Sequence, residues 1–305
     1  SSSSAASDVY KRQHYMNLNK LIETYYMIDE FLKDFMPILN KHALPSHRNP
    51  TRTCSMNLSE IMTILVMFHA GEFRNFKAYY HHIMQYHTNE FRKLVSYNRF
   101  ISLIPRTCLP LFFFTQSLPK TQTGCYFIDS TVLKACHEKR GHSNKVFKGL
   151  ATKGKTTTGW FFGFKLHLIV NNIGEIMNFK LTTGKVDDRV PVGDLVKHLT
   201  GKVYGDKGYI KKALFESLIE KGIQLITKIK KNMKNVCMTW WDKMMLRKRS
   251  IIETIIDQLK NISQIEHTRH RSVNNFLANL MAGIGAYALK NKKPTIKIIN
   301  NLDLQ

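Results

Sequence analysis

The hydrophobic pattern of this chain changes its period at Gly124, and this change limits the fold more than any other feature of the sequence. Before it, from about Asn17 to Leu118, apolar residues recur at three- and four-residue steps, the spacing of amphipathic helices. After it, short apolar runs bounded by turn residues alternate with helical stretches. The sequence therefore predicts an all-α N-terminal region followed by an α/β domain.

The second half of the chain contains five short apolar runs that favour strands. They lie at 124–131, 159–171, 175–184, 202–208 and 224–229. Helices are expected at 188–199, 209–221, 249–265 and 272–290, and 132–158 is expected to be a basic loop. The order strand, hairpin, helix, strand, helix, strand, helix is that of an RNase H-like fold. It predicts a mixed five-stranded sheet flanked by helices.

The N-terminal half predicts several short helices with basic faces. The first is limited by Pro37, the second begins near Asn57 or Ser59 and ends at Gly71, and two more are expected at 73–86 and 88–104. Such helices suit a helix-turn-helix-like DNA-binding region, and a bundle that only supports the catalytic part is the alternative. The predicted divisions are a non-native or disordered leader at 1–13, a DNA-binding region at 14–118, a catalytic domain at 119–291 and a tail at 292–305.

The charge balance indicates a polyanionic partner. The 46 Lys and Arg residues oppose 22 Asp and Glu, which gives a formal net charge of +24. Such a charge attracts nucleic acid and supplies its phosphate contacts. No apolar stretch has the length and continuity of a membrane span. The five cysteines form no CxxC pair, which is typical of free thiols in a reducing, cytoplasmic compartment.

Three acidic residues lie where a metal-dependent nuclease needs them. Asp129 in YFIDST and Asp206 in VYGDKGY each end a predicted strand, and Glu253 in RSIIETIIDQLK lies on a predicted helix. The first and fourth strands of this fold are parallel neighbours, so both aspartates should meet at one sheet edge. Carboxylates suit Mg²⁺ or Mn²⁺, and two such ions roughly 4 Å apart can promote phosphoryl transfer.

Each acid also has a purely structural interpretation. Both aspartates precede turn residues, and Glu253 could form only a solvated helix charge pair. Asp187 and Asp188 are rival ligands, although their position before a predicted helix suits an N-cap better. Asp257, one helical turn after Glu253, is a weaker rival.

The segment 228–249 interleaves basic residues with two tryptophans. Lysines supply phosphate contacts and a tryptophan can stack on an unpaired base, while the alternative is that a tryptophan anchors the loop to the core. With the lysine that follows Asp206, the candidate DNA-binding residues here are Lys207, Lys228, Lys230, Lys231, Trp240 and Trp241.

The blocks YFIDST, KLHLIVNNIGEIMNFKLTTGKVDDRVP, VYGDKGYI and R-x₃-E-x₆-K resemble DDE transposases. More narrowly, they resemble bacterial insertion-sequence transposases of the 982 family, over about residues 15–290. The resemblance implies that Asp129, Asp206 and Glu253 hold two divalent ions and that Arg249 and Lys260 contact DNA near the cut. The wider signature often has Tyr seven residues before the Glu, where this chain has Leu246.

The resemblance further implies cleavage at the ends of an insertion sequence and strand transfer into target DNA. The expected partners are the terminal inverted repeats and the target, bound by a homodimer or higher oligomer associated with the bacterial nucleoid. Two alternatives stay open at this point. One is a metal-dependent nuclease that cuts without joining, and the other is a catalytically inactive DNA-binding relative.

Overall fold

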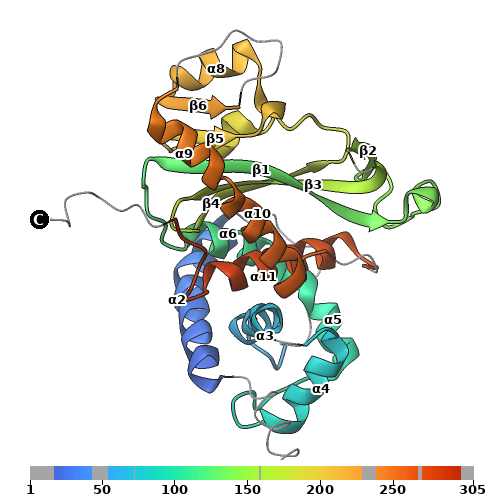
Figure 1. Ribbon diagram of the computed structural model, residues 1–305. Helices are drawn as coiled ribbons and strands as arrows, with labels where there is room; N and C mark the ends of the chain where they lie inside the picture. The colour runs from blue at the N-terminus through green and yellow to red at the C-terminus, as the bar shows by residue number, and fades with distance from the viewer. Residues whose placement is uncertain are drawn as a thin grey trace, which may run out of the picture. The chain divides into compact units, whose positions relative to one another are not determined.

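The computed structural model describes residues 17–42, 54–71, 73–157, 159–228, 238–266 and 270–296 (Figure 1). The chain divides into two compact units. The helical unit comprises residues up to 117 with 261–265 and 272–289, and the sheet unit comprises 118–260, 266–271 and the residues from 290 on. The catalytic domain predicted from the sequence, 119–291, includes residues 272–289, which belong to the helical unit in the structure. No helix among the described residues combines the length and apolar composition needed to cross a membrane.

The helical unit is built from amphipathic and buried helices. Its α-helices are α2 (Leu18–His42), α3 (Leu58–Ala70), α4 (Phe76–Tyr86), α5 (Tyr97–Leu103), α6 (Cys108–Ser117) and α11 (Val273–Ala288), with a 3₁₀ turn η1 (Ile104–Thr107). Most residues of α3 are buried, so it forms the core of this unit. As the sequence predicts, α3 begins after Asn57 and ends before Gly71. The Glu60 carboxylate accepts the Asn57 N–H at 2.7 Å.

Two helix predictions in this unit are corrected. Helix α2 does not stop at Pro37 but runs on to His42. A proline inside a helix removes only one hydrogen bond and bends the helix, and the rings of Phe31 and Phe35 hold α2 against α6. The helix expected at 88–104 begins only at Tyr97, because the Ser96 hydroxyl accepts a backbone N–H and caps it.

The described residues of the sheet unit form six strands in all. The strands are β1 (Cys125–Cys136), β2 (Thr152–Thr156), β3 (Gly159–Asn171), β4 (Ile176–Thr183), β5 (Gly201–Gly205) and β6 (Ile223–Thr227). The long strand β1 lies between β3 and β5. β1 pairs antiparallel with β3 and parallel with β5, which pairs parallel with β6. The outer edge of β3 pairs first with β2 and then with β4, both antiparallel.

The arrangement β4-β3-β1-β5-β6 is the RNase H-like sheet that the element order predicts. The prediction of five strands missed β2, which lies in the segment expected to be a loop. Its sequence, TKGKT, has no apolar alternation, so only pairing with β3 makes it a strand. β1 likewise continues to Cys136 beyond its predicted end because β3 pairs with it along that length.

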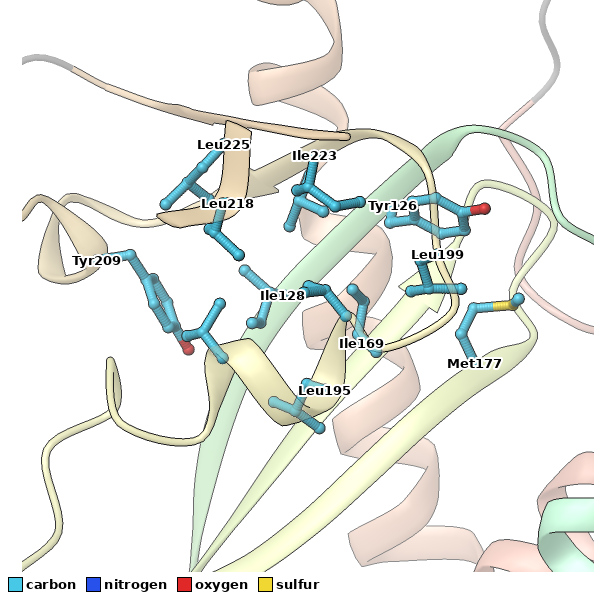
Figure 2. Packing of buried hydrophobic residues seen from close by; sticks show 13 residues of the cluster. Tyr126, Ile128, Ile169, Met177, Leu195, Leu199, Tyr209, Leu218, Ile223 and Leu225 are labelled. Atoms are coloured by element: carbon cyan, nitrogen blue, oxygen red, sulfur yellow. The ribbon is translucent and has the colours of Figure 1, made fainter. Parts of the chain in front are cut away.

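Helices cover both faces of this sheet. One face carries the apolar cluster shown in Figure 2, and β1 contributes Tyr126 and Ile128 to it. The helices α7 (Val192–Leu195) and α8 (Lys212–Ile219) cover this cluster. α9 (Trp240–Lys248) and α10 (Ser250–Asp257) pack beside β5 and β1, and α10 continues into the π-helical turn η4 (Gln258–Ile262). The helix predicted at 188–199 is shortened to α7. Pro191 directly precedes Val192, the first residue of α7, and a proline at this position cannot continue a helix that starts earlier in the chain.

Candidate active site

Asp129 and Asp206 each lie two residues beyond the point where two parallel strands stop pairing. β1 and β5 pair only as far as Phe127 opposite Tyr204. Beyond that pair β5 ends, whereas β1 continues with Asp129 opposite Leu168 of β3. Asp129 therefore lies within its strand. The sequence had suggested that it lies at the strand's end. The parting of β1 from β5 still leaves both carboxylates at the carboxyl end of the parallel pair, the usual position of sites in such sheets.

Arg249 binds two of the three predicted acids. It lies at the junction of α9 and α10. Its Nη1 donates to Asp129 Oδ2 at 2.8 Å, and its Nη2 donates to Glu253 Oε1 at 2.6 Å, one helical turn away. The side chains of Arg249 and Asp129 are 19% and 23% exposed, and that of Glu253 is 56% exposed. This bridge from Arg249 to two carboxylates therefore has two arms. The arm to Asp129 is mostly buried, and the arm to Glu253 is solvated.

The third acid acts on the same guanidinium through its charge. Burial alone would lower the pKa of Arg249, but the charges of Asp129, Glu253 and Asp206 outweigh it and raise that pKa. Burial raises the pKa of Asp129, and Arg249 and the Ser130 N–H, which donates to Oδ1 at 2.8 Å, partly offset the rise. Arg249 therefore contacts two of the predicted acids and is influenced by the charge of the third.

Sequence reasoning missed Tyr209, which lies among these acids. Its ring is 2% exposed, and its hydroxyl has no hydrogen-bond partner among the described residues. Burial, followed by the charges of Asp129, Asp188 and Asp206, raises the pKa of this tyrosine well above its ordinary value. The phenol therefore stays neutral. The sequence feature that could have identified Tyr209 is its position in VYGDKGY, three residues after Asp206.

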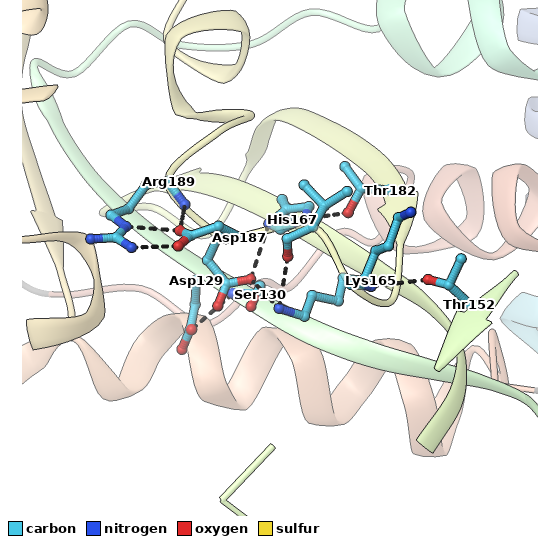
Figure 3. Close-up of polar contacts among 11 residues, drawn as sticks. Asp129, Ser130, Thr152, Lys165, His167, Thr182, Asp187 and Arg189 are labelled. Atoms are coloured by element: carbon cyan, nitrogen blue, oxygen red, sulfur yellow. Dashed lines mark hydrogen bonds and ion pairs between the residues drawn. The ribbon is translucent and has the colours of Figure 1, made fainter. Parts of the chain in front are cut away.

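Asp188 contacts two side chains of β3, Lys165 and His167, both of which are labelled in Figure 3. It does not cap a helix as predicted, since α7 begins only after Pro191. Its Oδ1 accepts from Lys165 Nζ at 3.1 Å and lies 3.8 Å from His167 Nδ1. His167 is fully buried, its Nε2 is 2.8 Å from the Thr182 hydroxyl, and burial lowers its pKa to about 4. The neighbouring Asp187 instead pairs with Arg189, with Oδ1 2.8 Å from Nε.

The predicted DNA-binding residues have different surroundings. Lys260 donates to Val132 O at 2.8 Å and lies 2.9 Å from Glu266, so it is already paired within the sheet unit. Lys207 and Lys228 are exposed. Leu246, at the position where the signature often has Tyr, is buried.

Of the two tryptophans, Trp240 at the start of α9 is 73% exposed and Trp241 is partly buried. Asp242 anchors this helix by accepting from Lys202 and Tyr204, both at 2.9 Å. Lys230 and Lys231 lie outside the described residues.

The donor chemistry of the acids fits a hard divalent cation. Asp129, Asp206 and Glu253 supply only carboxylate oxygens, and their combined charge already stabilises the guanidinium of Arg249. Within the described residues, however, no three His, Cys, Asp or Glu side chains are gathered closely enough to hold one metal ion. Arg249 occupies the space between Asp129 and Glu253, so joint ligation by these two would require the guanidinium to leave.

A family model described as "Transposase DDE domain" matches residues 120–273. The chain belongs to this family of DDE transposases. The match covers about half of the chain and includes all three acids together with Arg249 and Lys260. Membership supports a transposase function and implies an enzyme of nucleic-acid cleavage that depends on divalent metal ions.

Two solved transposase structures match the chain at low sequence identity. A piggyBac transposase synaptic complex with hairpin DNA is 11% identical, with a TM-score of 0.48, over 90% of this chain and 74% of that chain. The Mos1 strand transfer complex is 8% identical, with a TM-score of 0.24, over 85% of this chain and 83% of that chain. Among curated proteins no significant sequence match is found.

Proposed function

We propose that this DDE transposase cuts DNA at the ends of an insertion sequence and joins the freed strand to target DNA. Its source would be a bacterial element of the 982 family, and it would act in the cytoplasm on nucleoid DNA. The observation that carries the proposal is that Asp129 and Asp206 lie just beyond the last paired residues of β1 and β5, while Arg249 joins Asp129 to Glu253. Asp129 and Glu253 bind this guanidinium directly, and the charge of Asp206 acts on it.

The reaction consists of two in-line displacements at phosphorus. Water attacks the phosphodiester at the element's end, the bond to the 3′-oxygen breaks, and a 3′-hydroxyl and a 5′-phosphate result. That 3′-hydroxyl then attacks a target phosphodiester, and a target 3′-hydroxyl leaves. Two Mg²⁺ or Mn²⁺ ions, when bound, would lower the pKa of the attacking group and neutralise charge on the phosphate.

The chain's own residues have distinct parts in this proposal. Asp129, Asp206 and Glu253 would hold the ions. Arg249, released from the two carboxylates, and Lys260 would bind phosphates next to the cut. The exposed Trp240 and the lysines of 228–249 would contact the flanking DNA.

The helical unit supplies the proposed contact to the terminal repeats. Helix α3 is too buried to enter a groove, whereas α4 exposes Lys77, His81 and Gln85 on one face. These residues are at four-residue steps, so they form a single polar stripe that could face a DNA groove. We therefore propose region 14–118 as the DNA-binding region, and a homodimer or higher oligomer as the form that brings two element ends together.

The test is an assay with pre-cut and uncut element ends, supercoiled plasmid and Mg²⁺. Asp129→Asn, Asp206→Asn and Glu253→Gln should each abolish both cleavage and joining. Asp257→Asn is the matched control, because this acid lies one turn after Glu253 on the same helix, and it should keep both activities.

Full activity of any of the three acid variants would show that the assigned site is wrong. Cleavage without joined product in the wild type would favour the nuclease alternative. No cleavage by a wild type that still binds the repeats would favour an inactive relative.

A further inference from the structure

An exposed tryptophan lies under two lysines on the hairpin formed by β2 and β3. The ring of Trp160 is 54% exposed. Lys153 Nζ lies 4.9 Å and Lys155 Nζ 5.6 Å from its centroid. The strand register explains this, because Lys155 is directly opposite Trp160 and Lys153 is its diagonal neighbour on the same face. Large aromatic rings are costly to leave in water, so this one needs a reason for its exposure.

The other face of the hairpin is fixed to the sheet by close packing. Gly154 and Phe161 lie on the opposite face of the hairpin from Trp160 and are buried. A Cβ on Gly154 would come within 2.3 Å of the Gly184 carbonyl oxygen and 2.6 Å of the Phe161 ring. Thr152 also accepts the Lys185 N–H at 3.0 Å. Because the backbone is pinned in this way, Trp160 is presented on a rigid support.

Further basic residues adjoin this hairpin. The 3₁₀ turn η2 (Glu138–Arg140) leads to Gly141, whose Cα approaches the ring of Phe162 so closely that a Cβ would lie 2.7 Å from it. Phe162 pairs with Lys153, so the exposed Lys139 and Arg140 lie near the hairpin. Glu138, 3.9 Å from Lys153, opposes their charge. We call Lys139, Arg140, Lys153, Lys155 and Trp160 the hairpin platform.

The hairpin platform is continuous with the candidate active site. Lys155 lines a cavity of about 540 Å³ together with Ser130, Lys165 and Asp188. Ser130 follows Asp129 directly and donates its N–H to that carboxylate. A polyanionic chain whose phosphate is held near Asp129 could therefore extend through this cavity onto the hairpin.

We propose that the hairpin platform binds an unpaired segment of the DNA strand next to the cut. Trp160 stacks on a base while Lys153 and Lys155 bind the adjoining phosphates. A duplex does not fit this chemistry, since the faces of its bases are covered by their neighbours and only an unpaired base offers a face to the indole. The proposal rests on the proposed function in one respect, the choice of DNA as ligand.

The test is binding of a fluorescein-labelled 12-nucleotide oligothymidine to the full chain in EDTA, followed by anisotropy over a salt series. Trp160→Ala should weaken binding about fivefold or more, from the alanine-scan range for base stacking. Trp160→Phe should retain most of the affinity. Lys153→Gln with Lys155→Gln should reduce the slope of log affinity against log salt by about 1.4, two phosphates at about 0.7 each.

Two controls separate stacking from damage to the hairpin. An abasic oligonucleotide of the same length should bind the wild type more weakly, but should bind Trp160→Ala no worse than the wild type. Lys211→Gln with Lys212→Gln removes the same charge from exposed positions at the start of α8 and should leave the slope nearly unchanged.

Unchanged oligothymidine binding by Trp160→Ala would overturn the proposal, as would equal losses for both proteins on the abasic probe. Equal or tighter binding of a 12-base-pair duplex would overturn its preference for an unpaired strand. These titrations involve no catalysis. Their failure would therefore leave the proposed reaction standing, and an inactive enzyme would leave the platform standing.

Discussion

Replacing Arg249 by Gln should destabilise the sheet unit much more than replacing its partner Glu253 by Gln. The arm to Asp129 joins two side chains that are about four-fifths buried, and a charge-assisted hydrogen bond there contributes about 1.5–3 kcal/mol. The arm to Glu253 is a solvated i,i+4 pair worth about 0.3–0.5 kcal/mol. Arg249→Gln should therefore cost about 2–3.5 kcal/mol and Glu253→Gln at most about 0.5 kcal/mol.

The assay is urea unfolding of the full chain in EDTA at neutral pH, where no metal ion can replace the guanidinium. The variants Arg249→Gln, Asp129→Asn and their combination form a double-mutant cycle, and the coupling between the two sites should be at least about 1.5 kcal/mol. Equal costs for Arg249→Gln and Glu253→Gln, or a coupling near zero, would refute the conclusion that Asp129 depends on this arginine.

Two further predictions concern the frame of the site. The folded-state pKa of His167 is about 4, below its unfolded value of about 6.5, so its contribution to stability is present above the unfolded pKa and lost as pH falls toward 4. Urea titrations should show a loss of about 2 kcal/mol between pH 7 and pH 5 that His167→Gln largely removes, and an unchanged pH dependence in that variant would contradict this. Gly154→Ala should cost about 1–3 kcal/mol, because the added methyl group meets the Gly184 carbonyl, whereas Gly208→Ala, with open space around it, should be nearly neutral in the same titration. Equal effects of the two substitutions would show that the hairpin is not pinned at Gly154.

Local patterns in the sequence identified most elements of the sheet unit. The alternation in GWFFGFKLHLIVN predicts β3 with its observed ends, Gly159–Asn171. Period-2 and period-3.6 patterns are local, so they can be read without knowing what each element packs against. The prediction failed where pairing alone decides the conformation, as in β2 and in the continuation of β1.

The sequence by itself determined most of the elements and their order, and its family motifs singled out the three acids as candidates. Only the tertiary structure decided how these acids are surrounded. Arg249 reaches Asp129 across 120 residues of chain, Tyr209 lies buried among the carboxylates, and Asp188 faces Lys165 instead of capping a helix. Burial and charge at a site depend on which distant segments meet there. No local period in the sequence records that meeting.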